Sequence, residues 1–175
     1  MQTIIVTSPV NINLPIEFLF WGFIFVYIIH ILEESTLPVI FVEKVKKNFW
    51  PEYSWKHFFG FNTLLLLLNI IAVLLFDFLR GGWLIFPLSL AIERTLNGLW
   101  HFAETIITKK YSSGLLASVA TWILFYFLIR YSLLKGEIPV NYFIISFVIG
   151  LLITGFMLGS LLSFKTRYKN KRDSK

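Results

Sequence analysis

Long apolar runs separated by short polar stretches dominate the chain. A helix that spans a membrane needs about 20 mostly apolar residues, and the chain contains several such runs, separated by glycine, proline and charged residues. The runs extend from about Leu14 to Glu34, His57 to Leu79, Trp83 to Ile107, Gly114 to Leu134 and Val140 to Phe164. The pattern predicts an all-α fold, a polytopic membrane helix bundle of about five transmembrane helices. One transmembrane domain would occupy residues 1–164, and a basic tail would occupy residues 165–175.

The stretch between the first two predicted spans, residues 37–56, is too polar to cross a bilayer. Its apolar positions recur on one helical face, at Val39, Val42, Val45 and Phe49. Aromatic residues of the kind that anchor proteins at membrane interfaces follow, at Trp50, Tyr53 and Trp55. The pattern predicts either an interfacial amphipathic helix or a loop that rests on the lipid headgroups.

Composition supports a membrane protein and excludes several other classes. Hydrophobic residues make up 57% of the chain and charged residues 15%, against roughly 45–50% and about 25% in soluble domains. The chain has no cysteine, which excludes disulfides, thiolate metal sites and a cysteine nucleophile. The net charge of +6 is divided among loops and the tail, so we expect no nucleic-acid partner.

Lysine and arginine gather on one side of the predicted bundle. That side would contain Lys44, Lys46, Lys47 and Lys56 in the first loop, Lys109 and Lys110 in the third, and Lys165, Arg167, Lys169, Lys171, Arg172 and Lys175 in the tail. The other side would contain Arg80, Arg130 and Lys135. Because basic loops of membrane proteins favour the cytoplasm, we expect an integral membrane protein with its N-terminus outside and its C-terminus cytoplasmic.

Ionisable residues within the apolar runs indicate a functional site, because they are costly inside a bilayer. His30 near the end of the first span shares a helical face with Glu33 and Glu34. In the third span a narrow stripe contains Glu93, Asn97, His101 and Glu104. His101 and Glu104 repeat the spacing of His30 and Glu33.

Both histidine–glutamate clusters are expected at the same depth, near the cytoplasmic ends of two spans that run in the same direction. Histidine and carboxylate ligands suit zinc, iron or manganese. The sequence therefore predicts a site for one or two divalent metal ions, and the alternative is a hydrogen-bonded polar core without metal. The predicted ligands are His30, Glu33, Glu34, His101 and Glu104.

Other polar residues are predicted to support the site or line a cavity. Asn97 lies one turn deeper and would ligate the ion or assist a ligand. Glu93 lies about 12 Å from His101 along the helix, too far to share an ion. With Arg94 and Asn69 it would form a buried ion pair or line a polar cavity. His57, at the start of the second span, is a weaker ligand candidate.

The stretch His30-Ile31-Leu32-Glu33-Glu34 resembles the signature of the HXXEE family of small membrane proteins. The family pattern also includes a further histidine, matched by His101, and a Tyr-x-Pro-Gly motif. Tyr111 and Gly114 match that motif, with Ser113 in place of the proline. The resemblance covers residues 14–114 and implies a site that includes Tyr111, but no particular reaction.

The first functional hypothesis is a metal-dependent membrane enzyme that acts on a lipid or another hydrophobic small molecule near the cytoplasmic leaflet. Hydrolysis is slightly preferred, with Glu34 as the general base or as a bridge to a second metal. The second is a di-iron oxidase or oxygenase, since helix bundles house such centres. The third is a carrier of metal ions or protons, which would need a homo-oligomer. The fourth is a non-catalytic membrane interaction protein.

Overall fold

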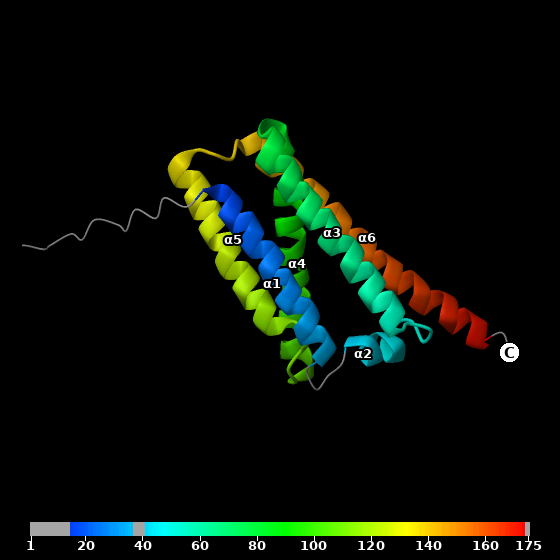
Figure 1. Cartoon of the computed structure of the whole chain (residues 1–175). Helices are drawn as coiled ribbons and strands as arrows, with labels where there is room; N and C mark the ends of the chain where they lie inside the picture. The colour runs from blue at the N-terminus through cyan, green and yellow to red at the C-terminus, as the bar shows by residue number, and fades with distance from the viewer. Residues whose placement is uncertain (1–14, 37–40, 174–175) are drawn as a thin grey trace, which may run out of the picture.

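The computed structural model describes residues 15–36 and 41–173, and the described residues are almost entirely helical, without any strand. This confirms the predicted all-α bundle. Figure 1 shows the arrangement of the helices. In chain order they are α1 (Ile16–Thr36), α2 (Phe41–Asn48), α3 (Trp55–Leu79), the short 3₁₀ helix η1 (Gly81–Leu84), α4 (Ile85–Thr108), α5 (Leu115–Lys135) and α6 (Val140–Asp173).

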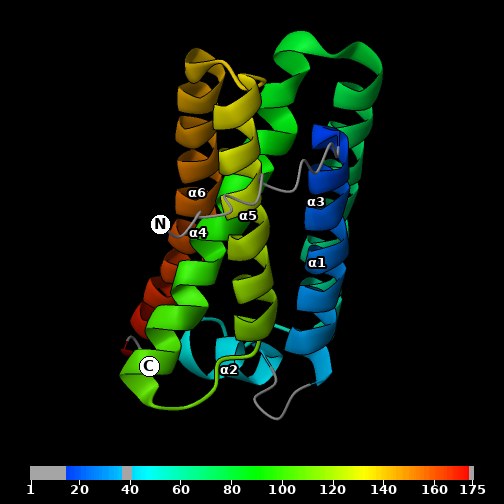
Figure 2. The ribbon, with the colours of Figure 1, turned by 90° about the vertical axis from the view of Figure 1, so that its left-hand side faces the viewer.

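Four of the helices, α1, α3, α5 and α6, are long and apolar enough to cross a membrane. The third predicted span, α4, is more polar because Glu93, Arg94 and Glu104 interrupt it. It contacts α1, α3, α5 and α6 and lies in the middle of the bundle (Figure 1). Because α4 runs between the same two ends as the apolar helices (Figure 2), it crosses whatever layer they cross.

The burial pattern explains why a polar helix can occupy this place. Residues 87–94 of α4 are buried on every side of the helix, so its polar groups face other helices instead of lipid. The apolar helices instead expose large side chains outward, for example Phe25 at 64%, Phe78 at 80% and Phe156 at 77%. Exposed apolar surface on this scale suits contact with lipid and would not be tolerated on a soluble monomer.

Helix α2 covers one end of the bundle. Val42 and Val45 are fully buried and pack with Tyr53 and Phe58, so the apolar face of α2 contacts the protein itself. The amphipathic helix predicted here is present, but these two valines do not face the membrane. The reason is that the end of the bundle offers an apolar surface of its own. Val39 lies outside the described residues.

The basic residues lie mainly at the α2 end of the bundle. There, Trp50 stacks on Phe164 of α6 with ring centroids 4.1 Å apart, and the Lys165 ammonium lies over the Phe49 ring. Helix α6 continues to Asp173 instead of ending at Phe164, because no proline or glycine follows Gly159. The predicted tail is therefore helical as far as Asp173. Which end of the bundle faces the cytoplasm stays a prediction.

Candidate metal centre

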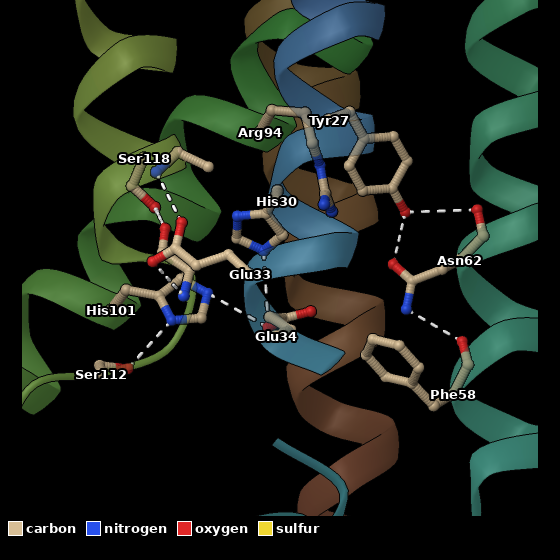
Figure 3. Close-up of polar contacts among 12 residues, drawn as sticks. Tyr27, His30, Glu33, Glu34, Phe58, Asn62, Arg94, His101, Ser112 and Ser118 are labelled. Carbon is tan, nitrogen blue, oxygen red and sulfur yellow. Dashed lines mark hydrogen bonds and ion pairs between the residues drawn. The ribbon is translucent and has the colours of Figure 1, made fainter. Parts of the chain in front are cut away.

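Three of the predicted ligands, His30, Glu34 and His101, lie close together in the interior of the bundle (Figure 3). His30 and Glu34 lie one turn apart on α1, and His101 faces them from α4. One ligand atom from each of these side chains lies within 4.8 Å of the others. All three residues are buried, with exposed fractions of 6% for His30, 5% for Glu34 and 1% for His101. We call these three residues the His/Glu group.

The distances within the His/Glu group are longer than hydrogen bonds. Oε1 of Glu34 lies 3.5 Å from Nε2 of His30 and 3.6 Å from Nε2 of His101, whereas N–H···O bonds measure about 2.7–3.2 Å. Two ligands of one tetrahedral zinc ion, each about 2.0–2.1 Å from it, lie about 3.4 Å apart. The spacing therefore fits ligands around an ion, and the group could hold a metal ion.

A hydrogen-bond chain determines which nitrogen of His101 faces Glu34. Nδ1 of His101 lies 3.1 Å from Oγ of Ser112, and the Ser112 hydroxyl donates to Oε2 of Glu104 at 2.5 Å. Because the only hydroxyl proton of the serine is used in that bond, Oγ accepts a proton from Nδ1 of His101. A neutral His101 therefore presents the lone pair of Nε2 to Glu34, as a metal ligand must.

Glu104, a predicted ligand, is not brought into the His/Glu group. Its Oε2 accepts hydrogen bonds from Ser112 and from the ammonium of Lys44, which lies 2.5 Å away on α2. Ser112 connects it to His101 through hydrogen bonds. The structure thus gives Glu104 a supporting position behind His101.

Glu33, also a predicted ligand, binds the start of α5 instead. Its carboxylate accepts backbone N–H bonds from Gly114, Leu116 and Ala117 at 2.8, 3.1 and 2.8 Å, and the Tyr111 hydroxyl donates to it. The first N–H groups of a helix have no partner within the helix and attract negative charge. Glu33 therefore fastens the 111–114 turn and α5 to α1.

Gly114 lies directly against the two histidines. Its φ of +101° is a conformation that side chains rarely adopt, and a Cβ there would lie 2.7 Å from Cε1 of both His30 and His101. Any other residue would bring its Cβ too close to both imidazoles, so one of these groups would have to move. The next residue back, Ser113, is fully buried and its hydroxyl has no hydrogen-bond partner in the described part of the chain. That position is thus suited to an apolar residue such as the proline of the Tyr-x-Pro-Gly motif.

Comparison with known families identifies the motif. A family model described as a protein of unknown function with HXXEE motif matches residues 21–129, more than half of the chain. The chain belongs to the HXXEE family. Neither a curated protein nor a solved structure matches it. The matched residues include the His/Glu group and the 111–114 turn.

The geometry divides the HXXEE motif between two tasks. The histidine and the second glutamate, His30 and Glu34, enter the His/Glu group, while the first glutamate, Glu33, binds the start of α5. Neighbouring helical residues point about 100° apart, so the two carboxylates reach different partners. Tyr111 supports the second task through its bond to Glu33.

A second buried polar cluster lies deeper in the bundle. Glu93 and Arg94 form a bidentate ion pair with two contacts of 2.5 Å, and both are buried. The Arg94 guanidinium lies 4.5 Å from the centre of the Tyr27 ring, and the Tyr27 hydroxyl donates to Oδ1 of Asn62 at 2.8 Å (Figure 3). The sequence predicted this ion pair as one of two alternatives.

Three other candidate residues do not join the His/Glu group. The amide of Asn69 donates to the Leu65 carbonyl within α3, and Asn97 is only partly buried. Nδ1 of His57 lies 2.9 Å from Oγ of Ser54, and the His57 ring packs beside the ring of Trp50.

Sequence reasoning missed Ser112 and Lys44. Ser112 occupies the variable position of the motif at residues 111–114, and a variable position gives no indication of a role. Lys44 gave no signal, since a lysine in a basic loop usually faces water.

Proposed function

We propose that this HXXEE protein is a metal-dependent membrane enzyme in which His30, Glu34 and His101 bind one divalent ion. The observation that supports the proposal is the meeting of these three buried side chains at the spacing of metal ligands. Two histidines and one carboxylate form a common ligand set for catalytic zinc and for non-haem iron(II). We favour zinc.

The number of ligands supports a catalytic ion over a structural one. Structural zinc sites have four protein ligands, whereas catalytic sites have three and leave one position for water or substrate. A dinuclear centre would need further carboxylates, and the nearest predicted ones, Glu33 and Glu104, already bind other groups. We therefore propose a single ion. Glu34 acts as a ligand through Oε1, so the general base is not assigned to it.

A groove on the outer face of the bundle supports a lipid-like substrate. The groove is open on its outer side and lies between α4, which holds His101, and α5, which follows the 111–114 turn. Its lining is almost entirely apolar: Thr95, Leu99, Phe102, Trp122, Phe125, Tyr126 and Ile129. An alkyl chain of a membrane lipid would fit such a surface.

The reaction we propose is hydrolysis of an ester or related bond in such a molecule. The ion would supply Lewis-acid polarisation of the bond that is cleaved. His30, His101 and Glu34 would hold the ion, and their burial would limit the access of bulk water.

Elemental analysis of the detergent-purified protein tests metal binding. The wild type is compared with His30→Ala and His101→Ala, and His57→Ala serves as a matched control because His57 lies outside the His/Glu group. We expect about one equivalent of zinc or iron in the wild type and the control, and its loss in the other two variants. Equal metal in all four proteins, or no metal in the wild type after reconstitution with zinc, would overturn the assignment.

A second measurement tests catalysis. Wild-type protein loaded with zinc should hydrolyse long-chain esters in mixed micelles, and the His30→Ala and His101→Ala variants should not. A preparation that binds zinc but hydrolyses no ester of any chain length would contradict the enzyme while leaving the ion site intact.

A further inference from the structure

A continuous series of polar contacts connects the covering helix α2 to the His/Glu group. Nζ of Lys44 on α2 lies 2.5 Å from Oε2 of Glu104 on α4. The same oxygen lies 2.5 Å from Oγ of Ser112, and Oγ of Ser112 lies 3.1 Å from Nδ1 of His101. The series is shielded from water. The side chains of Lys44 and Glu104 are 10% and 19% exposed, and Ser112 is 2% exposed.

The chemistry of these groups gives the series one direction. An ammonium only donates hydrogen bonds and a carboxylate only accepts them, so Glu104 accepts hydrogen bonds from both Lys44 and Ser112. Ser112 is then left with its lone pairs for His101. The far end of the series is an N–H on Nδ1, and this leaves Nε2 of His101 without a proton when the ring is neutral.

We propose that Ser112 and Glu104 are positioning residues that fix this tautomer of His101, and that Lys44 makes α2 part of the metal centre. The inference rests on the proposed function of the His/Glu group as a metal site. Metal-binding histidines commonly donate their second N–H to a neighbouring group, and loss of such a neighbour weakens metal affinity about 10–100-fold.

Lys44 affects the metal centre because it holds the Glu104 carboxylate in place. Glu104 follows His101 by three residues on α4, near the covered end of the bundle. Without Lys44 the Glu104 carboxylate would lose its cationic partner and keep only the neutral Ser112 hydroxyl. It would then turn toward water, since an unpaired buried charge is costly. Ser112 would then be free to donate its proton elsewhere, including to Nδ1 of His101. Docking of α2, through buried Val42 and Val45, is therefore coupled to the metal affinity of a site on two other helices.

The tautomer can be measured without any metal. Metal-free protein with ¹⁵N-labelled histidine is placed in detergent micelles, and the ring nitrogen shifts of His101 are assigned by their absence in His101→Ala. We expect Nδ1 to be protonated in the wild type and in Ser112→Thr, which keeps the hydroxyl. In Ser112→Ala we expect Nε2 to gain most of the proton. A wild-type His101 protonated on Nε2, or an unchanged tautomer in Ser112→Ala, would overturn the inference.

Zinc titration measures the consequence for binding. Lys44→Met, Glu104→Gln and Ser112→Ala should each raise the zinc Kd about 10–100-fold, while Ser112→Thr should stay close to wild type. The matched control is Lys46→Met, which removes a lysine from an exposed pair with Glu43 on the same helix. A purely structural role would lower thermal stability without changing the Kd of the folded fraction or the tautomer.

The outcomes separate this inference from the proposed function. A wild type that binds no zinc contradicts the proposed function, whereas the NMR experiment still decides the tautomer. A wild type that binds zinc with the same Kd as all three variants overturns the inference alone. If Ser112→Ala does not fold, the zinc Kd of Lys44→Met, a variant of the covering helix α2, is compared with that of the wild type instead.

Discussion

Two buried polar clusters lie between α1 and α4, and they differ in how their charges are satisfied. The Glu93–Arg94 pair joins opposite charges through two contacts of 2.5 Å. In the His/Glu group one carboxylate faces two imidazoles at 3.5 and 3.6 Å, too far for good hydrogen bonds. The pair is complete without a ligand. The His/Glu group has no such matched partner, and its spacing could hold a metal ion.

The difference shows that burial of ionisable residues does not by itself identify a functional site. Both clusters are costly to bury, and sequence reasoning selected both for that reason. What distinguishes them is whether the buried donors and acceptors match. The Glu93–Arg94 pair satisfies its two charges within itself, whereas the carboxylate of the His/Glu group lies 3.5 and 3.6 Å from two imidazoles, a spacing that a metal ion would fit.

The largest effect is expected from breaking the matched pair. Arg94→Leu should lower the free energy of unfolding by about 3–5 kcal/mol, because it leaves Glu93 buried and unpaired. The double variant Glu93→Leu/Arg94→Leu should recover most of that loss and bind zinc with wild-type affinity. Denaturant unfolding in mild detergent and zinc titration provide the measurements. Loss of zinc or proton flux in proteoliposomes formed from a stable double variant would instead support a carrier.

The His/Glu group should respond in the opposite direction. Glu34→Gln replaces an acceptor with an amide that can donate to an imidazole, so the metal-free variant should be more stable than wild type. The wild type should gain about 2.7 kcal/mol at a zinc concentration of 100 times its Kd, and the variant should gain almost nothing. Thermal unfolding with and without zinc measures both, with Glu52→Gln in an exposed loop as the control. A zinc-dependent gain in Glu34→Gln equal to that of the wild type would contradict the comparison.

A smaller effect is expected from Gly114→Ala, which disturbs the geometry of the His/Glu group and keeps all its ligands. The positive φ should cost about 1–3 kcal/mol, and the new Cβ would meet both imidazoles at 2.7 Å, which should also weaken zinc binding. Gly155→Ala in α6 is the matched control, because its Cβ would meet nothing within 4 Å. That variant should gain roughly 0.5–1 kcal/mol. Similar unfolding and zinc affinity in the two alanine variants would refute the close approach.

The smallest effect concerns Tyr111, which supports the group only through Glu33. Tyr111→Phe should cost about 1 kcal/mol at neutral pH. Partial burial and the hydrogen bond to Glu33 raise the pKa of Tyr111 from 10.0 to about 12. The neutral hydroxyl is therefore favoured in the folded state, and its contribution is complete below pH 10 and lost between pH 10 and about 12. Unfolding measured across this range should show a steeper loss in the wild type than in Tyr111→Phe, and parallel curves would contradict the bond.

The helices were predictable because each depends on local composition. Predicted and observed limits agree closely for α3, which was expected from His57 and begins at Trp55, and for α6, which begins at Val140 as predicted. The end of α6 was not predictable from hydropathy, because its basic residues leave the apolar run but remain good helix formers. The central place of α4 also required the structure, since a polar helix has no preferred neighbour in its own sequence.

The candidate site was predictable in its residues and only partly in its arrangement. Spacing along α1 correctly placed His30 and Glu34 on one face, and the stripe on α4 included His101. The same spacing argument gave Glu33 and Glu104 equal standing as ligands, and the structure gives both of them other partners. Spacing fixes which side chains share a helical face, but not which neighbour that face meets.

The sequence by itself therefore determined an all-helical membrane bundle and the polar residues from which a site could be built, because apolar runs and helical periodicity are local properties. Only the tertiary structure decided that His30, Glu34 and His101 meet, that Glu33 binds the start of α5, and that Lys44 reaches Glu104. The physical reason is rotational. Each residue turns about 100° around its helix, so two adjacent glutamates face different neighbours, and packing of distant helices determines what those neighbours are.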